Sequence, residues 1–304
     1  MNTQHFIYAL EIEKTRSVTQ AASNLFMTQP TLSKAVKDLE DSLGFAVFKR
    51  TSKGMIPTQK GAEFLVYAKR IAQQLRKMDS ALHAQDASHQ LFSLAIPRAS
   101  YIAQAASEFI CSFDNSRDME IEVMEASSLK VMEAVADGHF VLGIIRCRAE
   151  DEDYFLRYLD VKDLQYETLW QSNYQVVMHQ EHPLADQGNL REEDFAPYIE
   201  ILFGDNSVPY APSNPEPVEN AKRILISDRA MKFDLLRNNK LAYIWSSPVP
   251  SEILQANHLV QRKCRQAGEF KDLLISRAGY HFSKLDRKFI DQLFLIKNKV
   301  AFDG

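Results

Sequence analysis

The chain has 304 residues, of which 45% are hydrophobic and 25% are charged, with 10 glycines and 11 prolines. This composition is that of a globular protein of about two domains, and it excludes a collagen-like, low-complexity or largely disordered chain. No window approaches the roughly 18 uninterrupted apolar residues of a membrane span, and Glu11, Lys14 and Arg16 occupy the place of an apolar signal core. We therefore expect no membrane contact and a cytoplasmic location.

The net charge of −4 is unevenly distributed along the chain. Residues 1–87 hold 12 Lys and Arg against 8 Asp and Glu, whereas the rest of the chain holds 24 against 32. This asymmetry favours an N-terminal segment that faces nucleic acid, joined to an acidic body, although ordinary solvated surface is the alternative.

The N-terminal residues show three short helical patterns. Phe6, Ala9 and Leu10 predict a first helix, and Ser17 or Thr19 is positioned to cap a second one. The third has Thr28 as its N-cap and Pro30 in its first turn, and its apolar face consists of Leu32, Val36, Leu39 and Leu43. Two helices joined by a short connection, the second one basic on its outer face, are typical of a helix-turn-helix. A helical hairpin whose polar face merely meets water is the alternative.

The outer face of the third helix has the residue types that read DNA. Gln29 is suited to pairing with adenine, Ser33 to several bases, and Lys34 and Lys37 to guanine or phosphate. Beyond it, strands around Val47–Thr51 and Met55–Ile56 flank Ser52-Lys53-Gly54, which predicts a hairpin wing carrying cations. The DNA-contacting residues that we predict are Gln29, Thr31, Ser33, Lys34, Lys37, Arg50 and Lys53.

A long helix is expected from Thr58 to about Ala87, with a length of about 45 Å. Its apolar positions alternate in steps of three and four, as in a coiled coil: Phe64, Ala68, Ile71, Leu75, Met78 and Leu82. The stripe could be buried against the same chain. We prefer pairing with a second copy because the flanking side chains are polar: Arg70, Gln73, Gln74 and Lys77.

These residues together resemble the N-terminal signature of LysR-type transcriptional regulators. The colinear positions are Ala21-Ala22, Leu25, Thr28-Gln29-Pro30-Thr31-Leu32-Ser33-Lys34, Leu39-Glu40, Leu43-Gly44, Phe48, Arg50, Thr58 and Gly61. Lys34 departs from the arginine that is frequent in the family, which keeps the charge and loses the bidentate fork. The resemblance implies a winged helix-turn-helix followed by a dimerising linker helix.

Beyond residue 88 strands alternate with helices, which implies an α/β body with mainly parallel strands. We expect strands at 91–96, 119–123, 140–145, 174–178, 199–203, 241–245 and 271–275, and helices at 101–113, 128–137, 228–238 and 283–297. The body resembles the family's two-lobed, periplasmic-binding-protein-like effector domain, including His182-Pro183-Leu184-Ala185 and the ending Phe289-Ile290 with Leu293. Asn238-Asn239 stands where the family often has a glycine-rich segment.

The predicted organisation is a DNA-binding domain at 1–58, a linker helix at 59–88 and an effector domain at 89–304. Lobe I would span about 89–161 and 265–304, and lobe II about 162–264. Ligands of open parallel sheets bind beyond the carboxyl ends of the strands, next to helix N-termini. The predicted effector-binding residues there are Arg98, Ser100, Ser127, Ser128, Arg146, Phe203, Ser227 and Trp245. By resemblance, Ser100 and Ser128 would donate to the ligand.

The arginines and aromatic residues among them favour a small organic anion, which helix N-termini also stabilise. The alternative for each arginine is simple pairing with a surface carboxylate such as Glu150 or Asp151.

No nucleotide-binding, hydrolase or zinc-helix motif occurs, so we expect no enzyme activity, no cofactor and no metal. His179 and His182 have the wrong spacing for a zinc helix and are expected at a strand end and loop. Cys111, Cys147 and Cys264 lie far apart in the sequence and are expected to be reduced thiols, mostly buried, although a thiol switch is the alternative.

The sequence therefore predicts a DNA-binding transcriptional regulator, modulated by a small effector and assembled as a homodimer or homotetramer through the linker helix. A solute-binding protein would share the lobed body but would carry an export signal and no winged segment. An enzyme would need a catalytic constellation in the cleft.

Overall fold

We analysed a computed structural model that describes residues 3–52, 54–82, 89–205, 222–265 and 267–303. The chain divides into two compact units, residues 1–87 and 88–304, and each is described by itself. Among the described residues, no helix is both long and apolar enough to cross a membrane.

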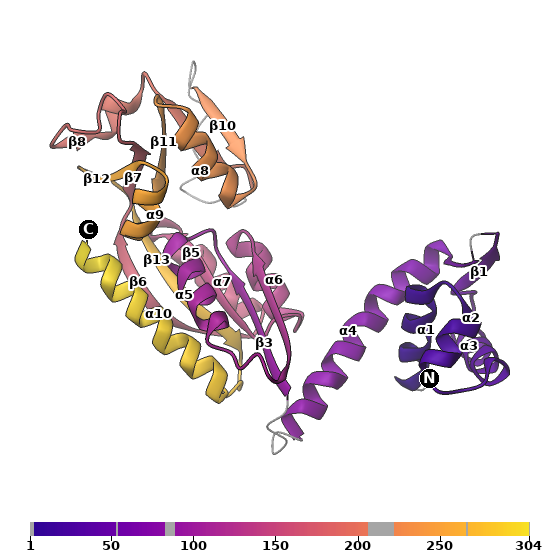
Figure 1. Cartoon of the computed structure of the whole chain (residues 1–304). Helices are drawn as coiled ribbons and strands as arrows, with labels where there is room; N and C mark the ends of the chain where they lie inside the picture. Colours follow the sequence, from indigo (N-terminus) through magenta and orange to yellow (C-terminus); the bar gives the residue numbers. More distant parts are fainter. Residues whose placement is uncertain (1–2, 53, 83–88, 206–221, 266, 304) are drawn as a thin grey trace. The chain divides into compact units, whose positions relative to one another are not determined.

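The N-terminal unit consists of helices and one small hairpin (Figure 1). Its elements are α1 (Thr3–Thr15), α2 (Val18–Asn24), α3 (Gln29–Leu43), β1 (Phe48–Thr51), β2 (Gly54–Pro57) and α4 (Gln59–Leu82). The two strands pair antiparallel, with Arg50 opposite Met55. The apolar stripes of all four helices meet in one core that includes Phe6, Ile12, Leu32 and Leu39.

The caps of the two central helices differ from each other. The Ser17 side chain accepts a hydrogen bond from the backbone N–H of Gln20, as expected for an N-cap. Thr28 occupies the N-cap position of α3, but its hydroxyl bonds the Thr31 hydroxyl at 2.8 Å and caps no backbone group. Gly44 ends α3 in the left-handed conformation at φ 75°.

The first half of α4 packs on its own unit. Leu65, Ala68 and Ala72 are buried there, and Phe6 contacts Phe64 edge-on. The stripe expected to face a second copy is thus partly used within the chain at Phe64 and Ala68, whereas Ile71 is 38% exposed. The side chains of Met78 and Leu82 and the backbone of residues 83–87 lie outside the described part.

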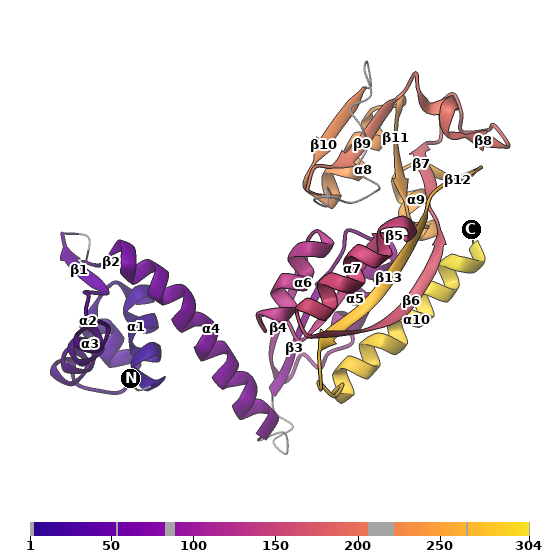
Figure 2. The same ribbon diagram turned by 180° about the vertical axis from the view of Figure 1, so that it is seen from behind.

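The C-terminal unit begins with a five-stranded sheet of order β4-β3-β5-β13-β6. Its strands are β3 (His89–Ile96), β4 (Asp118–Glu125), β5 (Leu142–Arg148), β6 (Leu164–Asn173) and β13 (Glu269–Arg277). The helices are α5 (Ser100–Cys111), α6 (Ser128–Ala136), α7 (Glu152–Val161) after the short η1 (Ala149–Asp151), and α10 (Lys284–Asp303). One core lies between the sheet and α5 and α10, and another between the sheet and α6 and α7 (Figure 2).

The second sheet has the order β10-β9-β11-β7-β12-β8. Its strands are β7 (Gln175–His179), β8 (Leu190–Arg191), β9 (Ile199–Phe203), β10 (Arg223–Ile226), β11 (Ala242–Ser246) and β12 (Leu259–Arg265). The remaining helices of this lobe are η2 (Glu192–Phe195), α8 (Arg229–Asn238) and α9 (Ser251–Ala256). The two-sheet α/β architecture is as expected for the body.

Two details of the body differ from expectation. The strand β6, in the segment assigned to lobe II, pairs with β13 and so belongs to the first sheet. The sheets are also mixed: β13 runs antiparallel to both of its neighbours, and β7 runs antiparallel to β11 and β12. The reason is that the chain crosses between the lobes as extended backbone, from β6 to β7 and back from β12 to β13, without a crossover helix.

The cysteines are less buried than expected. Cys147 is buried, Cys264 is intermediate and Cys111 is exposed, and none of them forms a disulfide. Burial raises the pKa of Cys147 to about 12, which makes this thiol a poor nucleophile.

Candidate functional site

The outer face of α3 presents polar side chains from a rigid helix. Gln29, Ser33 and Lys37 follow one another at four-residue spacing, and the Gln29 amide donates to the Ser33 hydroxyl at 2.8 Å. Gln29, Lys37 and the predicted partners Thr31 and Lys34 are exposed, and Ser33 is half-buried. Because Leu32, Val36 and Leu39 are buried on the opposite side, this face cannot turn inward without exposing the core.

The hairpin that follows α3 in the sequence carries further cations. Lys49 and Arg50 on β1 are exposed, and Lys53, the other predicted contact, lies outside the described residues. Gly54 has φ 97°, and a Cβ there would lie 2.4 Å from the Arg16 carbonyl oxygen. Only glycine fits this turn.

Three residues of the N-terminal signature hold the hairpin and α4 in place. The Glu40 carboxylate accepts the backbone N–H groups of Val47 and Phe48 at 2.7 and 3.0 Å. The Thr58 hydroxyl donates to the Ala46 carbonyl at 2.7 Å and accepts from the N–H of Gly61. A Cβ at Gly61 would lie 2.0 Å from the Val47 carbonyl oxygen. These contacts have a structural role, because they hold the β1–β2 hairpin in a fixed position against α3 and α4.

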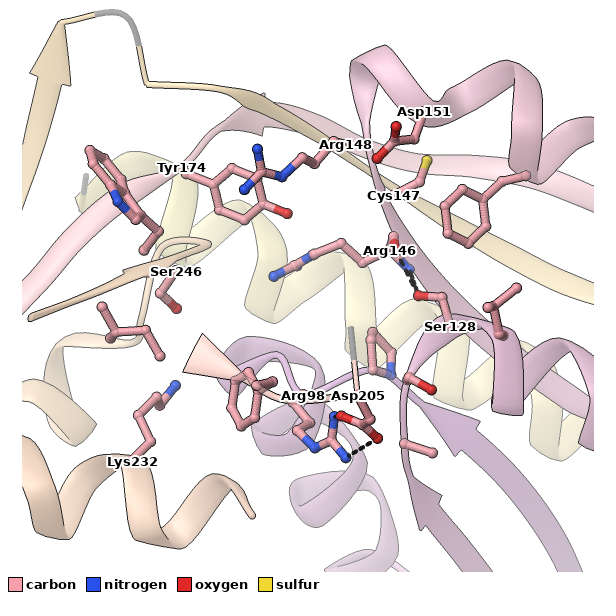
Figure 3. A pocket seen from close by; sticks show the side chains of 18 residues that line it. Arg98, Ser128, Arg146, Cys147, Arg148, Asp151, Tyr174, Asp205, Lys232 and Ser246 are labelled. Atoms are coloured by element: carbon pink, nitrogen blue, oxygen red, sulfur yellow. Dashed lines mark hydrogen bonds and ion pairs between the residues drawn. The ribbon is translucent and has the colours of Figure 1, made fainter. Parts of the chain in front are cut away.

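The C-terminal unit contains a cavity of about 150 Å³ where elements of the two lobes meet (Figure 3). Six of the predicted effector-binding residues line it: Arg98, Ser127, Ser128, Arg146, Phe203 and Trp245. Ser100 is fully buried and does not line the cavity directly, and Ser227 is exposed and lies outside the lining.

Arg98 is held across the lobes by Asp205. Its two terminal nitrogens donate to the two carboxylate oxygens at 2.7 and 2.9 Å, and the guanidinium lies 4.9 Å from the Phe203 ring centroid. The hydrogen bonds from Arg98 lower the pKa of Asp205. The carboxylate partner is therefore neither Glu150 nor Asp151, which the sequence had suggested as alternatives.

Arg146 is likewise paired, with a carboxylate far away in the sequence. Its Nε and Nη2 donate to the fully buried Asp272 at 2.7 and 2.6 Å, and the Tyr101 hydroxyl donates to the same carboxylate. Burial, followed by the charge of Asp272, raises the pKa of Tyr101 well above its usual value. The network fixes the guanidinium at the cavity wall.

The serines at the cavity are already engaged with the chain itself. The Ser128 hydroxyl donates to the Arg146 carbonyl at 2.7 Å and accepts from the Arg146 N–H at 3.0 Å. Ser127 is the N-cap of α6 without a side-chain cap bond. Ser100, at the start of α5, accepts a hydrogen bond from Lys232 at 3.3 Å.

Lys232, which the sequence analysis missed, is the least expected residue of the cavity. It lies on α8 one turn before Leu236, so both side chains fall on the inward face, and Lys232 is 1% exposed. Burial, followed by the charge of Arg229, lowers the pKa of Lys232 to about 7. A lysine at an inward-facing position of an amphipathic helix is the sequence signal that could have revealed it.

His179 and His182 lie at a strand end and in the turn after it, as expected. His179 ends β7 and accepts the Glu181 N–H at its Nδ1, and His182 accepts the Leu184 N–H in the same way. Burial lowers the pKa of His182 to about 4. No group of three or more His, Cys, Asp or Glu side chains in the described ranges is arranged to hold a metal ion.

Comparison with known proteins identifies the N-terminal segment. Residues 3–62 match the family model described as bacterial regulatory helix-turn-helix protein, lysR family. The chain is 29% identical over 205 residues to the uncharacterized HTH-type transcriptional regulator YwbI of Bacillus subtilis, covering 66% of this chain and 64% of that protein. It is 27% identical over 211 residues to the HTH-type transcriptional regulator CysB of Burkholderia cenocepacia, covering 67% and 64%. The chain thus spans just under two thirds of the length of these relatives, which are named as regulators and not as enzymes.

Solved structures share the fold over almost the whole chain. A full-length OxyR variant from Pseudomonas aeruginosa aligns with a TM-score of 0.59 at 15% identity, covering 97% of this chain and 95% of that one. Full-length CbnR, in complex with its target DNA, aligns with a TM-score of 0.60 at 15% identity, covering 97% and 100%. At this identity the likeness concerns the fold.

Proposed function

Since this chain belongs to the family of LysR-type transcriptional regulators, we propose that it binds particular sequences of double-stranded DNA and that a small organic ligand between its lobes adjusts this binding. The exposed polar face of α3 is the observation that carries the proposal. A helix in the major groove meets base edges with its N-terminal side chains, and Gln29, Thr31 and Ser33 occupy that part of α3.

The cations have a different role in this proposal. Lys34, Lys37 and Arg50, with Lys53 beyond the described part, would contact phosphates or guanine and position the helix without reading most of the sequence. CbnR, which shares the fold, was solved with its target DNA, and this supports DNA binding by the fold.

We further propose that two copies of the chain pair through α4. Val66, Tyr67 and Ile71 are 49%, 61% and 38% exposed on this helix within one chain, which leaves apolar surface for a partner. Light scattering of the purified protein at micromolar concentration should give the mass of a dimer or of a tetramer. A monomer under these conditions would contradict the pairing.

The cavity between the lobes is the proposed effector site. Arg98 with Asp205 and Arg229 with Glu125 join the two lobes around it, at 2.7 and 2.6 Å. A ligand that binds there would favour one relative position of the lobes, and this preference could bias the spacing of two paired DNA-binding domains. The ligand itself would be a small organic anion.

The division between base-reading and phosphate-contacting residues can be tested with two alanine variants. We expect Ser33→Ala to change affinity mainly at one base position, by about 1–3 kcal/mol, because a base-edge contact is lost. Arg50→Ala should weaken all duplexes similarly and reduce the slope of log affinity against log salt by about 1. Both are measured by fluorescence anisotropy on duplex variants at several salt concentrations.

Arg237→Ala is the matched control, since it removes the same charge from an exposed position on α8. It should leave both the base preference and the salt slope unchanged. Equal, sequence-independent losses for Ser33→Ala and Arg50→Ala would contradict the proposed placement of α3.

A further inference from the structure

Lys232 differs from the other cations that line the cavity because its charge is not matched. Arg98 is paired with Asp205, Arg146 with Asp272, and Arg148 with Glu150. Glu125, a carboxylate whose charge acts on Lys232, forms its ion pair with Arg229, at 2.6 Å. Within the described residues, Lys232 has no carboxylate within ion-pair distance; its ammonium is bonded to Ser100 at 3.3 Å and lies 4.5 Å from the Phe233 ring centroid.

A buried ammonium with these neighbours is unfavourable in a folded protein. Burial strongly penalises an ion unless a counter-charge and hydrogen bonds replace its water. One hydroxyl and one ring face replace only part of that hydration. Leucine or methionine on this inward face of α8 would avoid the cost, so the position points to a group that supplies the missing negative charge.

The surroundings of the ammonium indicate the size and nature of that group. Lys232, Ser246 and Arg146 lie around the same space and come from α8, β11 and β5 (Figure 3). Phe203 and Trp245 add apolar lining. A cavity of about 150 Å³ is comparable with one that accepts a molecule the size of benzene.

We propose that Lys232 receives the carboxylate of a small organic acid and so makes this cavity selective for anions over their neutral analogues. The proposal rests on the proposed function of the cavity as the effector site and adds the residue that recognises the negative charge of the effector. Because Lys232 belongs to lobe II and its hydroxyl partner Ser100 to lobe I, an anion at this point contacts the junction of the lobes.

Proton uptake should accompany this binding. Burial lowers the pKa of Lys232 to about 7, and the charged groups that act on it are Arg229, Glu125 and Arg146. A bound carboxylate favours the ammonium form and raises this pKa. Near and above pH 7 the protein must therefore take up a proton when the acid binds, and the affinity should fall as the pH rises.

Isothermal titration calorimetry of the full chain tests the proposal with three acids and their amides: acetate and acetamide, succinate and succinamide, benzoate and benzamide. We expect at least one acid to bind and its amide not to bind. Its dissociation constant should rise about tenfold between pH 6 and pH 8, since the protonated fraction of a group with a pKa near 7 falls by that factor. The binding enthalpy at pH 8 should differ between buffers of different ionisation enthalpy, which reports the proton taken up.

Lys232→Met keeps an unbranched side chain, one atom shorter, and removes its charge, so it should weaken acid binding at pH 6 at least tenfold. Lys284→Met, at an exposed position at the start of α10, is the control and should bind as the unchanged protein does. The buffer comparison needs no variant and therefore decides the question even if Lys232→Met does not fold.

The proposal is overturned if none of the acids binds, if acids and amides bind alike, if binding takes up no proton at pH 8, or if folded Lys232→Met binds the acid as the unchanged protein does. Such a result would leave the regulator function intact when sequence-specific DNA binding is still observed. Conversely, acid binding through Lys232 in a chain without sequence-specific DNA binding would support this site and contradict the regulator function.

Discussion

Replacing Asp272 by alanine should lower the free energy of unfolding of the C-terminal unit by about 3–5 kcal/mol. Asp272 is fully buried and accepts hydrogen bonds from both Arg146 and Tyr101, so its loss leaves a guanidinium and a hydroxyl without their partner. Both tryptophans, Trp170 and Trp245, lie in this unit. Urea unfolding followed by tryptophan fluorescence therefore reports on it selectively.

The double variant Asp272→Ala with Arg146→Met is the control for this explanation. Most of the loss should come from the unpaired charge of Arg146, so removing that charge should restore a large part of the stability. If the double variant were as unstable as Asp272→Ala alone, the loss would come from packing, and the ion pair would not be its cause.

Replacing Gly61 by alanine should destabilise the N-terminal unit by about 3 kcal/mol, because the new Cβ would meet a backbone oxygen. That Cβ would lie 2.0 Å from the Val47 carbonyl oxygen, so no side-chain rotation relieves the contact. Helix propensity favours alanine by about 1 kcal/mol, which is the smaller effect. Helical circular dichroism of the full chain during urea unfolding should show a transition that moves to lower urea, while tryptophan fluorescence stays unchanged.

Gly188→Ala is the matched control, since a Cβ at Gly188 would meet nothing within 4 Å. It should leave both transitions in place. Equal stability of the Gly61→Ala and Gly188→Ala variants would show that the close approach of α4 to the hairpin is not required for folding.

The N-terminal unit was well predicted because its determinants are local. The apolar spacing of Leu32, Val36 and Leu39 predicts both α3 and its buried face, and Ser17 caps α2 as the sequence suggested. The hydrogen bonds of Glu40 could not be predicted from local sequence patterns. Its partners Val47 and Phe48 come close to it only after the turn at Gly44 brings the chain back.

The sheets of the C-terminal unit were predicted less completely. Strands with a clear apolar run were found, and β9 lies at the residues expected for it. The strand β6 was missed because most of its side chains are exposed, so it lacks such a run. Since the chain leaves the first sheet after β6 and returns to it in β13, the antiparallel pairing of these two strands was missed as well.

The cavity shows the same division between local and distant information. Strand ends pointed to Arg98 and Arg146, which the structure places in the cavity wall. Their carboxylate partners, Asp205 and Asp272, lie more than a hundred positions away, and only the folded chain brings them together. The helical pattern of α8 could have shown that Lys232 faces inward, but only the folded chain shows that no described carboxylate pairs with it.

Selection of random duplexes by the purified full chain tests most directly whether α3 reads DNA sequence. Sequencing the retained duplexes should show one enriched motif, with two related half-sites if two copies bind together. The same selection with the Gln29→Ala and Ser33→Ala variants should change the preferred bases at defined positions of that motif. Retained duplexes without any enriched motif, or a motif that neither substitution alters, would contradict the account.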